Sequence, residues 1–162
     1  MTDLVFMRHG HSLSASEAGV RADSERPLSP RGEKEALEAA RHLSASGFVP
    51  ARIVSSPYLR ADRTAEIAAA VFTSAARETA SALSDGPAQA VLDLLLGLAR
   101  NGEKVLVVGH QPLMGAIAGY FLDRDGFDLS PAGFVRVNYS LQPGSSALVE
   151  FYSPPPFEEE PR

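Results

Sequence analysis

Short apolar runs alternate with helix-like segments along most of this chain, and this alternation restricts its fold more than any other feature. The run from Val105 to Val108 is apolar throughout, as expected for a strand that is covered on both faces. Residues 4–7 and the pair Ile53-Val54 have the same character. Strands that alternate with helices predict an α/β protein, a three-layer sandwich in which helices flank a mostly parallel central sheet.

Apolar residues at helical spacing lie between these runs. One helix is expected to begin at Ser29 and Pro30, because Ser is a favoured N-cap and Pro is favoured at the first helical position, and to end at Gly47. Residues 9–29 are polar and contain several Ser and Gly residues, so a long loop is expected there. The other expected helices start at Pro57 and cover residues 88–100 and 112–122.

The C-terminal part of the chain has a different pattern. Apolar and polar residues alternate over 134–139 and over 147–151, with Gly144 between them, which predicts a hairpin of antiparallel strands. We therefore expect one folded domain over residues 1–152. Residues 153–162 are rich in Pro and Glu and are expected to form a flexible tail.

Composition argues against several classes of protein. None of the 162 residues is a cysteine, which removes disulfides, thiolate metal sites and cysteine nucleophiles. The net charge of −5 argues against a nucleic-acid partner. No apolar run is long enough to span a bilayer and the first residues lack the basic stretch of a secretory signal, so no membrane partner is expected and a cytoplasmic location is predicted. Nothing in the sequence implies an oligomer.

Basic side chains follow each of the three buried runs. They are, in chain order, Arg8 and His9, then Arg60, then His110. Because ligands of open α/β sheets bind beyond the carboxyl ends of the strands, we expect these groups to converge. Arg60 also lies four residues before Thr64, in line with the apolar stripe of its helix, where a buried guanidinium requires an anion.

Each of these residues also has an ordinary structural interpretation. Either Arg could be the ion-pair partner of an acidic residue, and either His could cap a helix from the core. As a set, however, basic groups at the strand ends of one sheet favour an anion site. His9 and His11 form an H-x-H pair that can bind metal, but no carboxylate or Cys stands beside them and nearby arginines repel a cation. No metal ion or other cofactor is therefore expected.

Phosphate is the anion that suits this set of residues. It carries close to two negative charges at neutral pH, and the planar fork of Arg donates parallel hydrogen bonds to it. Two arginines and a protonated His would balance that charge, which leaves the second His to attack as a neutral imidazole. A tight turn at Gly10 could supply the carbonyl that fixes its tautomer. The residues alone thus predict metal-independent phosphoryl transfer through a phosphohistidine.

Three motifs in this order resemble the histidine phosphatase superfamily, also called the phosphoglycerate mutase-like family. They are Arg8-His9-Gly10, Ser56-Pro57-Tyr58-Leu59-Arg60-Ala61 and Gly109-His110. The segment over residues 26–32 is similar to the bacterial phosphohistidine phosphatase (SixA) branch. The resemblance implies that His9 is the nucleophile that becomes phosphorylated and that the phosphate is bound by Arg8, Arg60 and His110.

Two positions depart from the family pattern. Arg63 replaces a common Gln and is expected either to add charge at the rim of the site or, preferably, to be solvated. Asp85 is the one carboxylate placed where many family members have a proton donor. An N-cap of the helix that begins near Pro87 is an equally good interpretation of Asp85.

The lack of a clear acid affects the expected substrate. An alkyl ester needs a general acid, whereas phosphohistidine leaves as imidazole, which can already carry its proton. The sequence therefore favours a phosphatase whose partner is a phosphorylated protein, cleaved at phosphohistidine. The alternatives are a phosphatase that acts on small phosphomonoesters and a phosphate-binding module without catalysis. The intact nucleophile argues against the second alternative.

Overall fold

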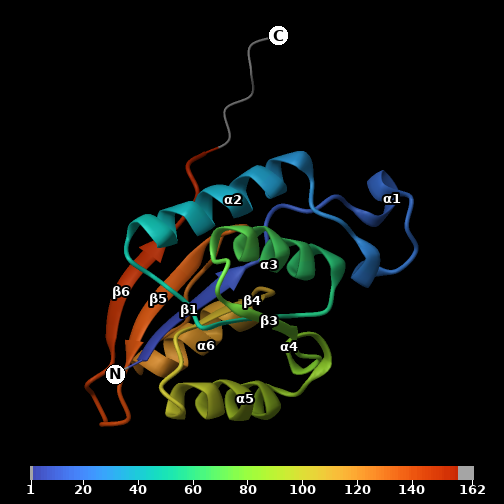
Figure 1. The fold of residues 1–162 in the computed structure, drawn as a ribbon. Coiled ribbons are helices and arrows are strands. Elements are labelled where there is room, and N and C mark those ends of the chain that lie inside the picture. Colours follow the sequence, from blue (N-terminus) through green and yellow to red (C-terminus); the bar gives the residue numbers. More distant parts are fainter. Residues whose placement is uncertain (1, 157–162) are drawn as a thin grey trace.

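A six-stranded sheet forms the centre of the molecule, and the computed structural model describes residues 2–156 (Figure 1). The strands in spatial order are β3 (Ala76–Thr79), β2 (Arg52–Ser55), β4 (Val105–Gly109), β1 (Thr2–Arg8), β5 (Phe134–Tyr139) and β6 (Ala147–Tyr152). The first four are parallel to one another, whereas β5 runs antiparallel to β1 and β6 antiparallel to β5. The predicted fold class is therefore confirmed, with its mostly parallel sheet and its antiparallel C-terminal pair.

Helices cover both faces of the sheet (Figure 1). One face carries α2 (Pro30–Ala45) and α3 (Leu59–Val71), and the other carries α5 (Ala88–Arg100) and α6 (Leu113–Leu122). Three short helical segments complete the described fold: α1 (Ala15–Ala18), the 3-10 turn η1 (Asp23–Glu25) and α4 (Ala82–Asp85). None of the described helices combines the length and the apolar character that crossing a bilayer requires.

Alternate residues of the central strands face the two helical layers. On β1, Leu4 and Phe6 pack in the cluster with α5 and α6, while Val5 and Met7 pack in the cluster with α2 and α3, and none is more than 2% exposed. Burying each such side chain stabilises the fold by about 1.5–3 kcal/mol. The apolar run predicted this two-sided burial, which leaves the carboxyl edge of the sheet to carry polar groups.

Local hydrogen bonds and residue types set the positions at which α2 and α3 begin. Ser29 caps α2, because its hydroxyl accepts a hydrogen bond from the backbone N–H of Gly32, and Pro30 stands at the first helical position as predicted. The next helix begins at Leu59, two residues later than Pro57. The hydroxyl of Ser56 accepts from the backbone N–H of Tyr58 and holds a turn before the helix.

The loop expected over residues 9–29 is more ordered than predicted. It contains α1, which has a capping box in which Ser14 and Glu17 bond to each other's backbone N–H groups. It also contains η1, and Ser12 and Leu28 form a short bridge across the loop. These elements are only three or four residues long, so they leave no periodic pattern in the sequence.

The segment between α3 and α5 also differs from the prediction. It forms β3, an edge strand whose residues are all exposed, and therefore it lacks the apolar alternation that signals a strand. It then forms α4, which ends at Asp85. The interpretation of Asp85 as a helix N-cap is wrong, because Pro87 holds the N-cap position of α5 and no side chain caps that helix.

Of the predicted C-terminal tail, residues 153–156 form neither helix nor strand, and residues 157–162 lie outside the described residues.

Candidate active site

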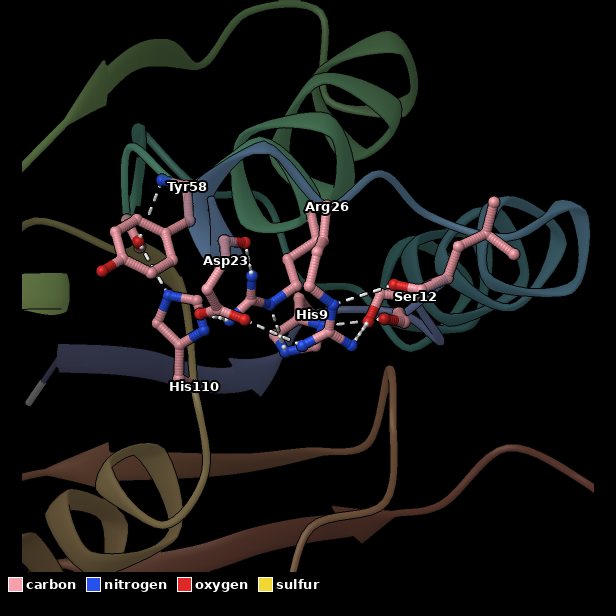
Figure 2. A network of polar contacts seen from close by, with 10 residues as sticks. His9, Ser12, Asp23, Arg26, Tyr58 and His110 are labelled. Atoms are coloured by element: carbon pink, nitrogen blue, oxygen red, sulfur yellow. Dashed lines mark hydrogen bonds and ion pairs between the residues drawn. The ribbon is translucent and has the colours of Figure 1, made fainter. Parts of the chain in front are cut away.

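The carboxyl ends of β1, β2 and β4 meet at one edge of the sheet. Arg8 of β1 is paired with Gly109 of β4, and Ser55 of β2 with Val108. The backbone N–H of His9 extends this pairing, because it donates to the carbonyl of Gly109 at 3.0 Å. The residues that follow the three strands are thereby brought together, as Figure 2 shows for the histidines that follow β1 and β4.

His9 is buried and its ring is oriented by its own turn. Its Nδ1 lies 2.7 Å from the carbonyl oxygen of Gly10, and this oxygen accepts the Nδ1–H bond. The remaining ring nitrogen, Nε2, therefore carries a lone pair, and it faces Nε of Arg60 at 3.4 Å. Burial is the main cause that lowers the pKa of His9 to about 3, and the nearby His110, Arg60 and Arg8 lower it further. The imidazole is neutral at physiological pH, as a nitrogen nucleophile must be.

The turn at Gly10 is held by α3 and α2. The hydroxyl of Thr64 accepts from the backbone N–H of Gly10 at 3.1 Å and donates to the carbonyl of Arg60 at 2.8 Å. A Cβ on Gly10 would lie 2.6 Å from the carbonyl oxygen of Gly32, so only glycine allows this approach. The carbonyl that fixes the tautomer of His9 is thus placed by packing between three elements.

Arg60 is 7% exposed and lies at the start of α3, in line with the buried side of that helix. Its Nη1 donates to the carbonyl of Asp23 at 2.7 Å, and its Nη2 donates to Oδ2 of Asp23 at 3.0 Å. The ring of Tyr58 lies against the guanidinium, 5.2 Å away. The anion that the sequence argument requires for Arg60 is, in this structure, the side chain of Asp23.

Arg8 has an unused donor. Its Nη1 donates to the carbonyl of Leu129 at 3.0 Å, while its buried Nε has no hydrogen-bond partner among the described residues. Burial lowers the pKa of Arg8, and the charge of Asp128 partly opposes this shift. A buried N–H without an acceptor is costly, and an anion bound at this edge would satisfy it.

Its own surroundings hold His110 neutral in this structure, and its protonation beside a bound phosphate stays a prediction. Burial, followed by the charge of Arg60, lowers its pKa to about 4, against an opposing effect of Asp23. Its Nε2 lies 2.8 Å from the hydroxyl of Ser56, and its ring meets that of His9 edge-on with 5.3 Å between centroids. A bound dianion would favour the charged form again, so His110 is suited to take up a proton with phosphate.

Other residues from the sequence analysis lie apart from this group. Arg63 pairs with Glu33 and Glu66, which places it in a surface ion-pair network and not at the rim of the site. Nδ1 of His11 bonds to the hydroxyl of Ser29. Within residues 2–156, no three His, Cys, Asp or Glu side chains are grouped to hold a metal ion.

Asp85 is exposed at the end of α4, and its carboxylate has no hydrogen bond or ion pair within the described residues. Its role as a proton donor stays a prediction. The sequence analysis missed Asp23 and Arg26, which join the group from the loop after β1. No periodicity marked Asp23, and Arg26 was noticed only as part of a family-like segment.

A neutral buried imidazole that keeps a lone pair on Nε2, beside two arginines and a second imidazole, is suited to attack phosphorus. The α/β fold with this group at the carboxyl edge defines a class of enzymes that transfer phosphoryl groups through a histidine.

The comparisons with known proteins agree with this class. The model of the histidine phosphatase superfamily (branch 1) matches residues 4–85, and the chain belongs to this superfamily. An uncharacterized protein of Picosynechococcus is 34% identical over 117 residues, which cover 70% of this chain and 68% of the relative.

Solved structures extend the likeness to most of the chain. A structure of the protein histidine phosphatase SixA complexed with tungstate is 25% identical, with a TM-score of 0.80 over 94% of this chain and 97% of SixA. A mycobacterial glucosyl-3-phosphoglycerate phosphatase shares the fold at 17% identity, with a TM-score of 0.69 over 94% of this chain and 100% of that protein. The chain is SixA-like within its superfamily, and the family supports phosphatase activity.

Proposed function

We propose that this protein is a metal-independent phosphatase that works through a phosphohistidine at His9 and that its substrate is phosphohistidine on a protein. The observation that carries the proposal is the ring of His9, whose Nδ1 bonds to the carbonyl of Gly10 while Nε2 faces Arg60. This orientation fixes the tautomer and directs the lone pair at the place where Arg60 would hold a phosphoryl group.

The proposed reaction has two displacements. Nε2 of His9 attacks phosphorus, the new N–P bond forms, and the bond from phosphorus to the leaving nitrogen breaks, so the substrate imidazole leaves. Water then attacks the phosphohistidine, a P–O bond forms and the N–P bond breaks. Both hydrogens of the water leave with the phosphate as dihydrogen phosphate, and His9 is restored as the neutral imidazole. Arg8 and Arg60 would bind the phosphoryl oxygens in both transition states. His110 would donate to a further oxygen once the dianion has raised its pKa.

The protein substrate is favoured by what this site offers to a leaving group. The imidazole of phosphohistidine leaves readily and can already carry a proton, so it does not depend on a strong general acid. Asp85, the predicted donor, is exposed and forms no hydrogen bond or ion pair with His9 or Arg60 within the described residues. The likeness to SixA, described as a protein histidine phosphatase, supports the same choice.

A small phosphomonoester is the second candidate. The end of β3 lies at the same edge of the sheet as the end of β2, because the two strands are parallel, and α4 with Asp85 follows directly. A shift of this short helix toward the site would provide an acid for an alkyl leaving group. The mycobacterial glucosyl-3-phosphoglycerate phosphatase, which acts on a small phosphomonoester, shares this fold. A module that only binds phosphate has no need of the oriented nitrogen of His9.

A substrate panel tests the proposal. The panel contains a protein phosphorylated on histidine, free phosphohistidine, an aryl phosphate, and sugar and nucleoside phosphates, each assayed in EDTA. We expect the phosphohistidine protein to give the highest kcat/KM, no loss in EDTA, and no turnover by His9→Ala. His42→Ala is the matched control, because His42 pairs with Glu150. A preference for alkyl esters, or activity restored by a divalent metal after EDTA, would contradict the proposal.

A further inference from the structure

The carboxylate of Asp23 lies between two guanidinium groups (Figure 2). Its Oδ2 accepts from Nη2 of Arg60 at 3.0 Å, and its Oδ1 accepts from Nη1 of Arg26 at 2.9 Å. The side chain of Asp23 is 59% exposed, whereas that of Arg60 is 8% exposed. A solvent-facing carboxylate from η1 is thus placed on a buried guanidinium of the site.

The position of Oδ2 is set by the geometry of Arg60. Nε and Nη2 point to the same side of a guanidinium and form the fork that binds two oxygens of a phosphate. In this structure Nε faces Nε2 of His9 at 3.4 Å, and Nη2 faces Oδ2 of Asp23 at 3.0 Å. A phosphoryl group that is held by this fork and attacked by His9 must therefore take the place of Oδ2.

We infer that Asp23 is an internal competitor for Arg60, which the phosphoryl group displaces on binding and which returns to Arg60 as phosphate leaves. By competing for the same fork, Asp23 weakens the binding of product phosphate and so limits product inhibition. The inference rests on the proposed function only in assigning Arg60 to the phosphate. It does not depend on which phosphorylated compound is the substrate.

The surroundings allow the exchange at little cost. Arg26 is held independently, because its Nε donates to the carbonyl of Leu13 and its Nη2 to the hydroxyl of Ser12, both at 2.9 Å. Asp23 can therefore leave Arg60 and keep an ion pair with Arg26. Arg60 also keeps its bond from Nη1 to the backbone carbonyl of Asp23 at 2.7 Å. Two side-chain hydrogen bonds of Arg60, from Nη2 to Asp23 and from Nε to His9, are exchanged for bonds to phosphate.

The test measures the dissociation constants of inorganic phosphate and of vanadate by isothermal titration calorimetry. It compares the wild type with Asp23→Asn. We expect Asp23→Asn to bind both anions roughly fivefold to tenfold more tightly, since a charge-assisted bond that competes with the ligand is weakened. The inhibition constant for phosphate in the enzyme assay should fall by the same factor. Asp23→Ala should behave alike, because it keeps the backbone carbonyl that Arg60 uses.

Asp128→Asn is the matched control. Asp128 also acts on the site, through its charge on Arg8, but it makes no hydrogen bond to Arg8 within the described residues. We expect this variant to change phosphate affinity by less than twofold. An equal gain in both variants would show that long-range charge suffices and would overturn the inference.

Two further readouts separate competition from other roles. In the wild type the NMR signal of Arg60 Nε–H should shift on adding phosphate, and in Asp23→Asn it should already be displaced before phosphate is added. Unchanged phosphate affinity in both Asp23 variants would overturn the inference. Unchanged affinity with kcat lost on alkyl phosphates alone would identify Asp23 as a proton donor instead. Failure of the phosphohistidine panel would contradict the proposed substrate and leave these titrations standing.

Discussion

At the scale of single residues, His9 depends on two physical effects that act together. Burial removes the proton, as the pKa of about 3 indicates, and the carbonyl of Gly10 selects which nitrogen keeps its hydrogen. A histidine in water has a pKa near 6.5 and exchanges freely between tautomers. The environment of His9 thus gives a nucleophilic Nε2 at any pH from about 5 upward, without a separate general base.

Replacing His9 by Ala should abolish turnover and leave phosphate binding within a few-fold of the wild type. The reason is that His9 would form the covalent bond, while the arginines supply most of the attraction for the anion. Rapid quenching of the wild type followed by mass spectrometry should find the phosphoryl group on His9. Finding it on another residue, or finding turnover in His9→Ala, would contradict the assignment.

At the scale of elements, the site depends on how closely the turn after β1 approaches the start of α2. A Cβ on Gly10 would lie 2.6 Å from the carbonyl oxygen of Gly32, and a Cβ on Gly32 would overlap the carbonyl of His11. Ser29 caps α2, and its hydroxyl oxygen also forms a hydrogen bond with Nδ1 of His11 at 2.7 Å. The position of α2 and the orientation of His9 are therefore coupled through backbone contacts.

Gly32→Ala should destabilise the protein by about 1–3 kcal/mol, because the new methyl group forces the backbone of the loop away from α2. The same change should lower kcat by moving the carbonyl that orients His9. Gly97→Ala is the control, since a Cβ added to Gly97 in α5 would point into open space. This change should stabilise the fold by up to about 1 kcal/mol. Urea unfolding of both variants measures the difference. Equal free energies of unfolding for Gly32→Ala and Gly97→Ala would show that the loop after β1 does not pack tightly against α2 in solution.

Asp85 lies at the end of the short helix α4, and its predicted role as an acid can be tested with leaving groups. If Asp85 does not act as an acid, the rate of the wild type should fall steeply as the pKa of the leaving group rises, and Asp85→Asn should scarcely slow phosphoramidates or activated aryl phosphates. A series of aryl and alkyl phosphates measures this slope in both proteins. If the rate of the wild type does not depend on the pKa of the leaving group, and that of Asp85→Asn depends on it steeply, then Asp85 donates a proton. That result would favour a small phosphomonoester as substrate.

At the scale of the whole molecule, the sequence predicted the helices and strands that have a regular apolar pattern. It missed the elements that are short or exposed. The run from Val105 to Val108 predicted a central buried strand, because both faces of it are apolar. The exposed strand β3 and the single-turn α4 carry no such periodicity, and their positions follow from tertiary packing. The convergence of Arg8, His9, Arg60 and His110 followed from parallel strand ends. The carboxylate of Asp23 could not be predicted, because its contact depends on the path of a polar loop.

The two buried histidines should also shape the stability of the whole fold against acid. Their pKa values are about 3 for His9 and about 4 for His110 in the folded protein, whereas an unfolded chain has values near 6.5. As the pH falls below 6.5 the unfolded chain binds protons that the folded chain does not, so the free energy of unfolding decreases. This loss sets in below pH 6.5, and it continues for each histidine until its folded pKa is reached.

Each histidine can contribute a slope of up to about 1.4 kcal/mol per pH unit within that window. Urea unfolding at pH 7.5, 6 and 5 should therefore show stability falling with acid in the wild type and a shallower fall in His9→Gln and in His110→Gln. Saturating phosphate should reduce the fall as well, because the bound dianion favours the protonated form of His110. Identical slopes in the wild type and both variants would mean that neither imidazole is held neutral, and the nucleophile would then have to be neutral by its ordinary titration alone.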